Sequence, residues 1–106
     1  MPVTEIQTTA QFDALVGTKQ LVAEFTSGWC KPCGWIGPKY EQLSRRYGNL
    51  TFVVVDGDKL RDLVARYKVT GLPQFIMFRG GRIVDEFGGI VEDVLERRVA
   101  RFAGGS

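Results

Sequence analysis

The feature that most constrains the fold is a pair of cysteines, Cys30 and Cys33, between an apolar run and a helical pattern. They are the only cysteines of the 106 residues, and two residues separate them. Their sulfurs can meet if the segment turns as the start of a helix, so the sequence predicts a strand, a short turn and a helix in succession. Such a pair either binds a metal ion or cycles between dithiol and disulfide.

Length and composition indicate one ordinary globular domain, since 44 % of the 106 residues are hydrophobic and 25 % are charged. We expect a single domain over residues 1–103 and a flexible tail at 104–106. The formal charge of +2 is small and the arginines are scattered, so a solvated surface is favoured over binding to nucleic acid or to an anionic membrane. No apolar run approaches the ~18 residues that cross a membrane.

The chain contains no histidine. This excludes imidazole general-base chemistry, Cys–His dyads and histidine-ligated metal from the chain alone. Two cysteines also cannot complete a four-thiolate zinc or iron–sulfur site without a second chain. The spacing therefore favours redox chemistry, while a metal site shared between two chains and an inert structural disulfide stay open.

The N-terminus shows no basic region followed by an apolar stretch, so no secretory signal is visible. Small secreted domains usually carry several disulfides, and one cysteine pair suits a reducing compartment instead. We therefore expect a cytoplasmic protein. An organelle reached through a transit peptide that is later removed is the alternative.

Hydrophobic periodicity predicts strands and helices in the order β-α-β-α-β-α-β-β-α. The expected strands cover residues 3–6, 21–26, 50–55, 74–79 and 82–87. The expected helices run from 8 to 17, from the cysteines to about 47, from an N-cap after a turn at 56–58 to about 67, and from 91 to about 102. Thr8 and Gln11 stand at the spacing of a capping box for the first helix, and we expect Tyr40 and Val91 to face the core. Strand–helix–strand units give parallel pairs, and the Gly80-Gly81 turn adds an antiparallel hairpin. The sequence thus predicts an α/β fold, with a central mixed sheet and helices on both faces.

At the predicted helix start, free backbone N–H groups favour the thiolate of Cys30 over its thiol. Lys31 adds a positive charge, and Pro32 fits the first turn because its missing N–H would have no partner there. Cys33 falls nearly one turn further along, on the same face and deeper. Cys30 would then attack a client disulfide and Cys33 would resolve the mixed disulfide.

Three other residues are candidates for the site. Glu24 interrupts an apolar strand, where a buried carboxyl would have a raised pKa and could pass protons to or from a cysteine; without a family, a glutamate at a bulge or strand edge that reaches solvent is favoured. Pro73 starts a strand, and the sequence alone favours a trans bond before it. Trp29 precedes the cysteine and is typical of a binding surface.

Together these motifs resemble the thioredoxin family over nearly the whole chain, from about Val3 to Phe102. Residues 29–33 (WCKPC) are similar to the family's WCGPC active site, and Pro38 matches the proline that bends its active-site helix. Gly71-Leu72-Pro73 resembles the loop that ends in cis-proline, and Phe87-Gly88-Gly89 resembles the strand end beside the active site. Residues 54–58 (VVDGD) look like the V-D-x-D stretch of eukaryotic cytosolic thioredoxins.

The resemblance implies the thioredoxin fold, a cis bond before Pro73, Cys30 as nucleophile and Cys33 as resolving thiol. It implies a shallow apolar groove that binds client backbone and is lined by Trp29, Leu72, Pro73, Gly88 and Gly89. It also implies a protein-disulfide reductase that binds no cofactor and takes electrons from an external thioredoxin reductase or an equivalent donor, NADPH-dependent in our expectation. We expect a monomer that binds neither nucleic acid nor membrane.

Four positions depart from the family pattern. Lys31 replaces the usual glycine, Gly34 stands where lysine or arginine is usual, Glu24 takes the place of a buried aspartate, and Gln74 replaces a common threonine. These changes leave the dithiol chemistry possible but leave open the reduction potential, the clients and the reductase. Two alternatives remain: a thioredoxin-fold binding module with little reductase-coupled turnover, and a metal-bridged dimer through Cys30 and Cys33.

Overall fold

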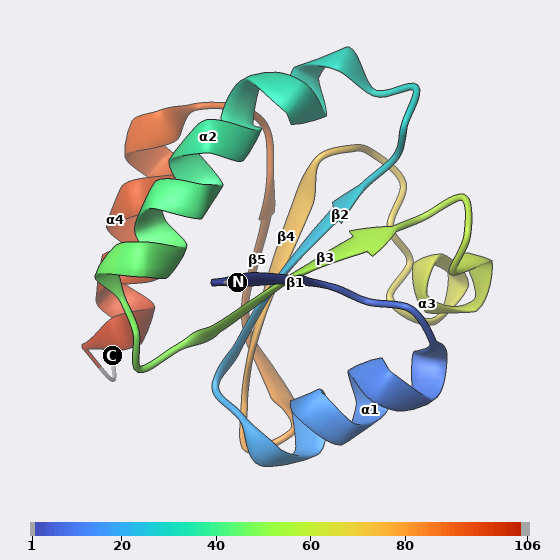
Figure 1. The fold of residues 1–106 in the computed structure, drawn as a ribbon, viewed down its shortest axis with the longest axis horizontal. Helices are drawn as coiled ribbons and strands as arrows, with labels where there is room; N and C mark the ends of the chain where they lie inside the picture. Colours follow the sequence, from blue (N-terminus) through green and yellow to red (C-terminus); the bar gives the residue numbers. More distant parts are fainter. Residues whose placement is uncertain (1, 105–106) are drawn as a thin grey trace.

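The computed structural model describes residues 2–104, which form a five-stranded sheet with helices on both faces (Figure 1). The predicted order of elements is confirmed. The strands are β1 (Val3–Glu5), β2 (Leu21–Thr26), β3 (Thr51–Asp56), β4 (Gln74–Arg79) and β5 (Arg82–Gly88). The helices are α1 (Thr9–Thr18), α2 (Lys31–Arg46), α3 (Arg61–Arg66) and α4 (Glu92–Ala103).

The strands lie in the order β1-β3-β2-β4-β5, so β2 is the central strand. It runs parallel to β3 and antiparallel to β4, and β5 pairs antiparallel with β4. The sheet is therefore mixed, as predicted. Gly80 and Gly81 join β4 to β5 with φ of 60° and 79°, which is the backbone that a two-residue hairpin turn of this kind requires.

Each face of the sheet carries its own apolar core. The first lies under α1 and α3 and includes Phe12, Phe25 and Leu63. The second lies under α2 and α4 and includes Val22 and Tyr40; Figure 1 shows these two helices on the same side of the sheet. Because successive side chains of a strand point to opposite faces, Glu24 of β2 shares the face of Val22. It therefore points to the side of the sheet that α2 covers.

The beginnings of the first two helices follow from local sequence. The hydroxyl of Thr8 accepts the N–H of Gln11 at 3.1 Å, so Thr8 caps α1 as predicted. The side chain of Gln11 accepts the N–H of Gln7 instead of that of Thr8. Cys30 is the N-cap of α2, and Pro38 lies inside that helix. The sequence therefore placed the cysteine pair correctly at a helix start.

Some predicted details were wrong. Helix α3 follows the turn at 56–58, but its N-cap is Leu60, which makes no side-chain capping hydrogen bond. Val91, predicted to face inward, is 60 % exposed, because it is the N-cap of α4 and its extended backbone lies off the helical stripe. Gly104, assigned to the flexible tail, donates to the carbonyl of Ala100 at 3.1 Å and caps α4. The rest of that tail lies outside the described residues.

Candidate active site

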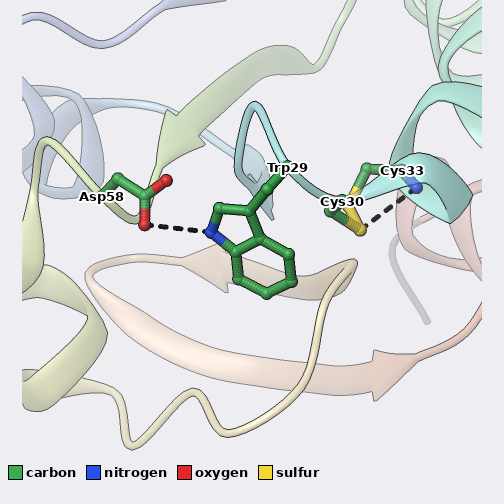
Figure 2. Close-up of a disulfide and its surroundings, with 4 residues drawn as sticks. All are labelled: Trp29, Cys30, Cys33 and Asp58. Carbon is green, nitrogen blue, oxygen red and sulfur yellow. Dashed lines mark hydrogen bonds between the residues drawn. A yellow bond between two sulfur atoms is a disulfide. The ribbon is translucent and has the colours of Figure 1, made fainter.

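Cys30 and Cys33 form a disulfide at the beginning of α2, with their Cα atoms 5.4 Å apart (Figure 2). The backbone N–H of Cys33 donates to the Cys30 sulfur at 3.3 Å. Cys30 is 9 % exposed and Cys33 is 5 % exposed, so Cys33 is the deeper of the two, as predicted. A helix N-terminus stabilises negative charge, and here one of its free N–H groups is directed at the sulfur expected to attack.

The loop around the disulfide also matches the expected placement. Lys31 is exposed and is the first residue of α2, and Pro32 lies in the same turn, where it breaks no hydrogen bond. Trp29 is 70 % exposed, and its indole Nε1 donates to the carboxylate of Asp58 at 3.3 Å (Figure 2). Sequence reasoning missed this role of Asp58; the V-D-x-D resemblance pointed to the segment but not to the contact.

The peptide bond between Leu72 and Pro73 is cis. This is the isomer that the family resemblance favours and not the trans isomer that the sequence alone favours. Gly89 donates its N–H to the carbonyl of Pro73 at 3.3 Å. A Cβ on Gly88 would lie 3.4 Å from the same carbonyl oxygen. The structure therefore brings these three predicted residues together.

Trp29 and Leu72 line a cavity of about 210 Å³ beside the disulfide loop. The remaining lining residues are Gly57, Asp58, Val64, Val69, Thr70 and Gly71. Pro73, Gly88 and Gly89 do not line it. The predicted groove thus has two parts on the described surface, the cavity beside Trp29 and the glycine strand end beside Pro73.

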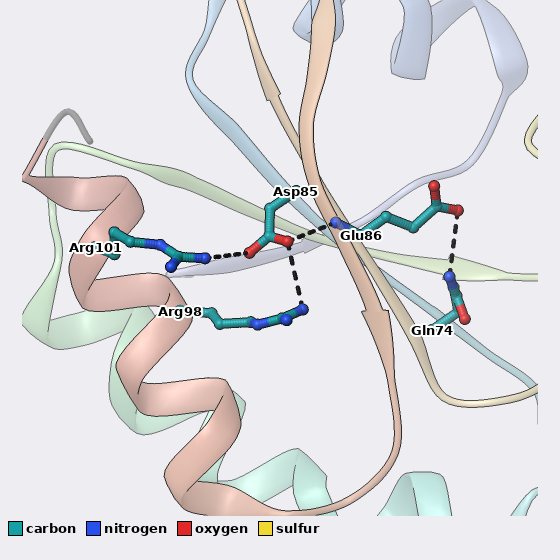
Figure 3. A network of polar contacts seen from close by, with 5 residues as sticks. All are labelled: Gln74, Asp85, Glu86, Arg98 and Arg101. Atoms are coloured by element: carbon teal, nitrogen blue, oxygen red, sulfur yellow. Dashed lines mark hydrogen bonds and ion pairs between the residues drawn. The ribbon is translucent and has the colours of Figure 1, made fainter.

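Gln74 extends the second part of this surface. Its side-chain amide donates to the carboxylate of Glu86 on β5 at 3.2 Å (Figure 3). Its Oε1 would lie 3.2 Å from a Cβ at Gly88, so a larger residue at position 88 would require the Gln74 side chain to shift. The glutamine at position 74 therefore adds a contact between β4 and β5.

Glu24 is 4 % exposed and stands in register with Val54 of β3 and Phe75 of β4. Burial, together with the smaller effect of the negative charge of Glu41, raises the pKa of its carboxyl to about 8. The alternative, a glutamate at a strand edge that reaches solvent, is wrong because β2 is the central strand. A carboxyl with this pKa can take up or release a proton near neutral pH.

Tyr40 of α2 occupies the same face of the sheet as Glu24. Its hydroxyl lies 2.9 Å from the carbonyl oxygen of Val22 and 2.7 Å from that of Val53, and it donates to them. Burial raises the pKa of Tyr40 well above its ordinary value, and the charge of Glu24 adds to the effect. The hydroxyl therefore stays protonated and ties α2 to β2 and β3. The sequence predicted a buried ring here but not this hydrogen bond.

The residues that the structure describes hold no group of three or more histidine, cysteine, aspartate or glutamate side chains placed to bind a metal ion. The sulfurs of Cys30 and Cys33 are bonded to each other. Within residues 2–104, no helix has the length and hydropathy that a membrane span needs. The features of the predicted site that the described residues show are the disulfide at the start of α2, the cis bond before Pro73 and the buried carboxyl of Glu24.

A disulfide at a helix N-terminus, on an α/β domain that also holds a cis-proline and a buried carboxyl, is the arrangement expected of a dithiol–disulfide oxidoreductase. Comparison with known proteins identifies the family. Residues 3–101 match the family described as Thioredoxin. A Thioredoxin H-type of Picea mariana is 43 % identical over 89 residues, which cover 83 % of this chain and 71 % of that protein. The Equus caballus thioredoxin is 39 % identical over 83 residues, covering 78 % and 79 % of the two chains.

The fold leads to the same family. The crystal structure of a poplar thioredoxin h superposes with a TM-score of 0.89 at 32 % identity, over 95 % of this chain and 96 % of that chain. The chain belongs to the thioredoxin family. It also matches a Caenorhabditis elegans peptide-N(4)-(N-acetyl-β-glucosaminyl)asparagine amidase at 32 % identity, but spans only 17 % of that protein.

Family membership settles the general chemistry. The protein is a thiol–disulfide oxidoreductase that acts on disulfide substrates through a redox-active disulfide. Thioredoxins work without a bound cofactor, and the same holds for this chain as a member.

Proposed function

We propose that the protein reduces the disulfides of client proteins in the cytoplasm as a monomer, with electrons from an NADPH-dependent thioredoxin reductase. One observation supports Cys30, and not Cys33, as the attacking residue: the backbone N–H of Cys33 lies 3.3 Å from the Cys30 sulfur. A thiolate at Cys30 would accept this hydrogen bond, and Cys33, which is less exposed, would remain the thiol. Charge-assisted hydrogen bonds of this kind are the stronger ones.

In the reduced protein, the Cys30 thiolate attacks one sulfur of the client disulfide. A bond forms between Cys30 and that sulfur, and the second client sulfur leaves as a thiolate that takes up a proton. Cys33 then loses its proton and attacks the Cys30 sulfur, which forms the internal disulfide and releases the first client sulfur. Two electrons pass from the protein to the client, and the reductase returns two electrons to the protein.

Glu24 is the proposed acceptor of the Cys33 proton. It lies on the face of β2 that α2 covers, and its pKa of about 8 suits proton transfer near neutral pH. The roles of Trp29, Leu72, Pro73, Gly88 and Gly89 are proposed as client binding. The contact between Gly89 and Pro73 and the exposure of Trp29 support this.

The function is tested by insulin reduction coupled to NADPH oxidation with a thioredoxin reductase. We expect turnover with the native chain, none with Cys30→Ser, and a trapped mixed disulfide with Cys33→Ser. Full activity of Cys30→Ser would overturn the assignment of the nucleophile. Binding of a partner that survives the loss of both cysteines, without coupled NADPH oxidation, would favour the binding module instead.

The cytoplasmic location and the monomeric state need their own measurements. A single cysteine pair suits a reducing compartment, which supports the proposed location. Fluorescence of the tagged full-length protein in its own cells tests the location. Sedimentation equilibrium of the oxidised and the reduced protein tests the monomer.

A further inference from the structure

The cavity beside Trp29 depends on a glycine. Gly57 is one of its lining residues, and a Cβ added there would lie 3.0 Å from Cγ2 of Val64 and 3.5 Å from the carbonyl oxygen of Thr26. A contact of 3.0 Å is closer than a carbon atom normally approaches another, so a larger residue would push on Val64 and take up space in the cavity. The absence of a side chain at position 57 therefore keeps this space open.

The size of the cavity suits a single side chain. Its volume is about 210 Å³. A cavity of about 150 Å³ admits a benzene molecule, whereas pockets for drug-sized ligands begin at about 300 Å³. The space is therefore too small for a nucleotide or another cofactor and large enough for one long side chain.

The lining defines the chemistry of that side chain. Four apolar side chains form most of the wall, those of Trp29, Val64, Val69 and Leu72. Among residues 2–104, Asp58 is the only charged residue that lines the cavity. One oxygen of Asp58 accepts from Trp29, and a carboxylate has further acceptor positions. Apolar walls with one carboxylate at the rim fit a long aliphatic stem that ends in a positive charge.

Two neighbouring features also favour a positively charged side chain in the cavity. The side chain of Asp56 accepts the N–H of Asp58 at 2.9 Å, which brings a second carboxylate close to the rim. The indole of Trp29 is 70 % exposed, and a tryptophan ring attracts cations that lie over its face. Two lysines are chain neighbours of lining residues: Lys59 follows Asp58 and Lys68 precedes Val69. Neither lysine lines the cavity.

The cavity also lies where a docked client would reach it. Trp29 precedes Cys30 and Leu72 precedes the cis-proline, so two lining residues are the chain neighbours of the attacking cysteine and of Pro73. The geometry points to a binding site for one lysine or arginine side chain of the client, close in sequence to the cysteine that Cys30 attacks. This inference rests on the proposed function, because it concerns how the client disulfide is selected.

The test measures reduction of synthetic disulfide peptides by the reduced protein under single-turnover conditions. Each peptide carries one lysine at one position within three residues of its cystine. Matched peptides carry norleucine, which has the same aliphatic stem without the charge, or glutamate. At low salt we expect the lysine peptide to react about fivefold faster than its norleucine partner at the best position. The ratio should fall as salt is added.

Two variants locate the effect in the cavity. Gly57→Val fills the space, and Asp58→Asn removes the charge while keeping an oxygen that can accept from Trp29. Both should bring the lysine-to-norleucine ratio close to one. Gly48→Val is the matched control, because nothing lies within 4 Å of a Cβ added at Gly48 and that residue does not line the cavity; its ratio should equal that of the native protein.

A second measurement does not depend on the stability of the Gly57 variant. A lysine peptide with alanine in place of its cysteines is titrated into the native protein, and backbone amide shifts are followed by NMR. Shifts at Gly57, Asp58 and Val69 that the norleucine peptide does not cause would support the site. Equal rates for all peptide sets, or a lysine preference that survives both cavity variants, would overturn it. Failure to reduce any peptide would instead count against the proposed function.

Discussion

The backbone N–H of Cys33 points at the sulfur of Cys30, at a distance of 3.3 Å. The donor of this contact belongs to the backbone of the first turn of α2, so a substitution of the Lys31 side chain does not remove it. The charge of Lys31 is different, because that side chain is exposed and its field is screened by salt. The two contributions to the reactivity of Cys30 can therefore be separated by ionic strength.

Lys31→Gly should raise the pKa of the Cys30 thiol in the reduced protein at low salt, and should raise it less at about 0.5 M salt. The pH dependence of the iodoacetamide reaction rate measures this pKa. Lys19→Gly is the control, because Lys19 is an exposed lysine at the end of α1 and should leave the profile unchanged. Identical profiles for Lys31→Gly and the native protein would show that Lys31 does not lower the pKa of the Cys30 thiol.

Glu24 should make the oxidised protein less stable as pH rises. Its pKa lies at about 8 in the folded chain, against an ordinary value of 4.5. Between these values the folded state holds a proton that the unfolded state has released. The free energy of unfolding therefore falls with rising pH, by at most about 1.4 kcal/mol per pH unit, and the stabilisation is complete only below about 4.5.

Glu24→Gln should remove this fall and leave the variant more stable than the native protein at pH 8. Urea denaturation of the oxidised protein from pH 4 to pH 9 measures it. Glu92→Gln, at the exposed first turn of α4, is the control and should keep the native slope. The same Glu24 variant should slow the resolving step; an unaltered rate of release of the mixed disulfide would rule out proton transfer by Glu24.

Ser27→Ala should stabilise the protein. Ser27 is 7 % exposed, and within the described chain its hydroxyl has no hydrogen-bond partner. A buried hydroxyl without a partner costs about 1–3 kcal/mol, and alanine removes it with little change in volume. Thermal and urea unfolding of the oxidised form should show a gain of about 1 kcal/mol. A loss of stability would mean that the hydroxyl has a partner.

Tyr40→Phe should weaken the attachment of α2 to the sheet. The substitution removes the donor to the carbonyls of Val22 and Val53 and keeps the ring that packs on Phe52 and Phe75. We expect a loss of about 0.5–1.5 kcal/mol in the free energy of unfolding. Tyr47→Phe, at the partly buried end of the same helix, is the control and should change stability by less.

Much of the fold and of the redox centre could be predicted because the responsible signals are local. Periodicity indicates which face of an element is buried, and the spacing of Cys30 and Cys33 fixes their position at a helix start. The cis bond at Pro73 could be anticipated only through the family, because isolated X–Pro bonds favour trans. Burial of Glu24 needed the knowledge that β2 is central, which is a property of the whole sheet.

The contacts that escaped prediction join residues far apart in the chain. Trp29 meets Asp58, and Gln74 meets Glu86, only once the strands have paired in register. The cavity at Gly57 likewise depends on where Val64 of α3 lies. A glycine in a sequence indicates a turn as readily as a cavity wall, so the pattern of residues alone does not distinguish them.

Asp85 is bound by two arginines of α4, Arg98 at 3.3 Å and Arg101 at 3.6 Å (Figure 3). The strand that carries it, β5, is the last of the sheet, and its exposed Ile83 and Val84 stand between charged residues. Another chain that added a strand to this edge would lie beside the charged Arg82, Asp85 and Glu86, and charged residues on an edge strand oppose such pairing. The edge is therefore protected against amyloid-like growth, and we expect concentrated solutions of the folded protein to stay clear.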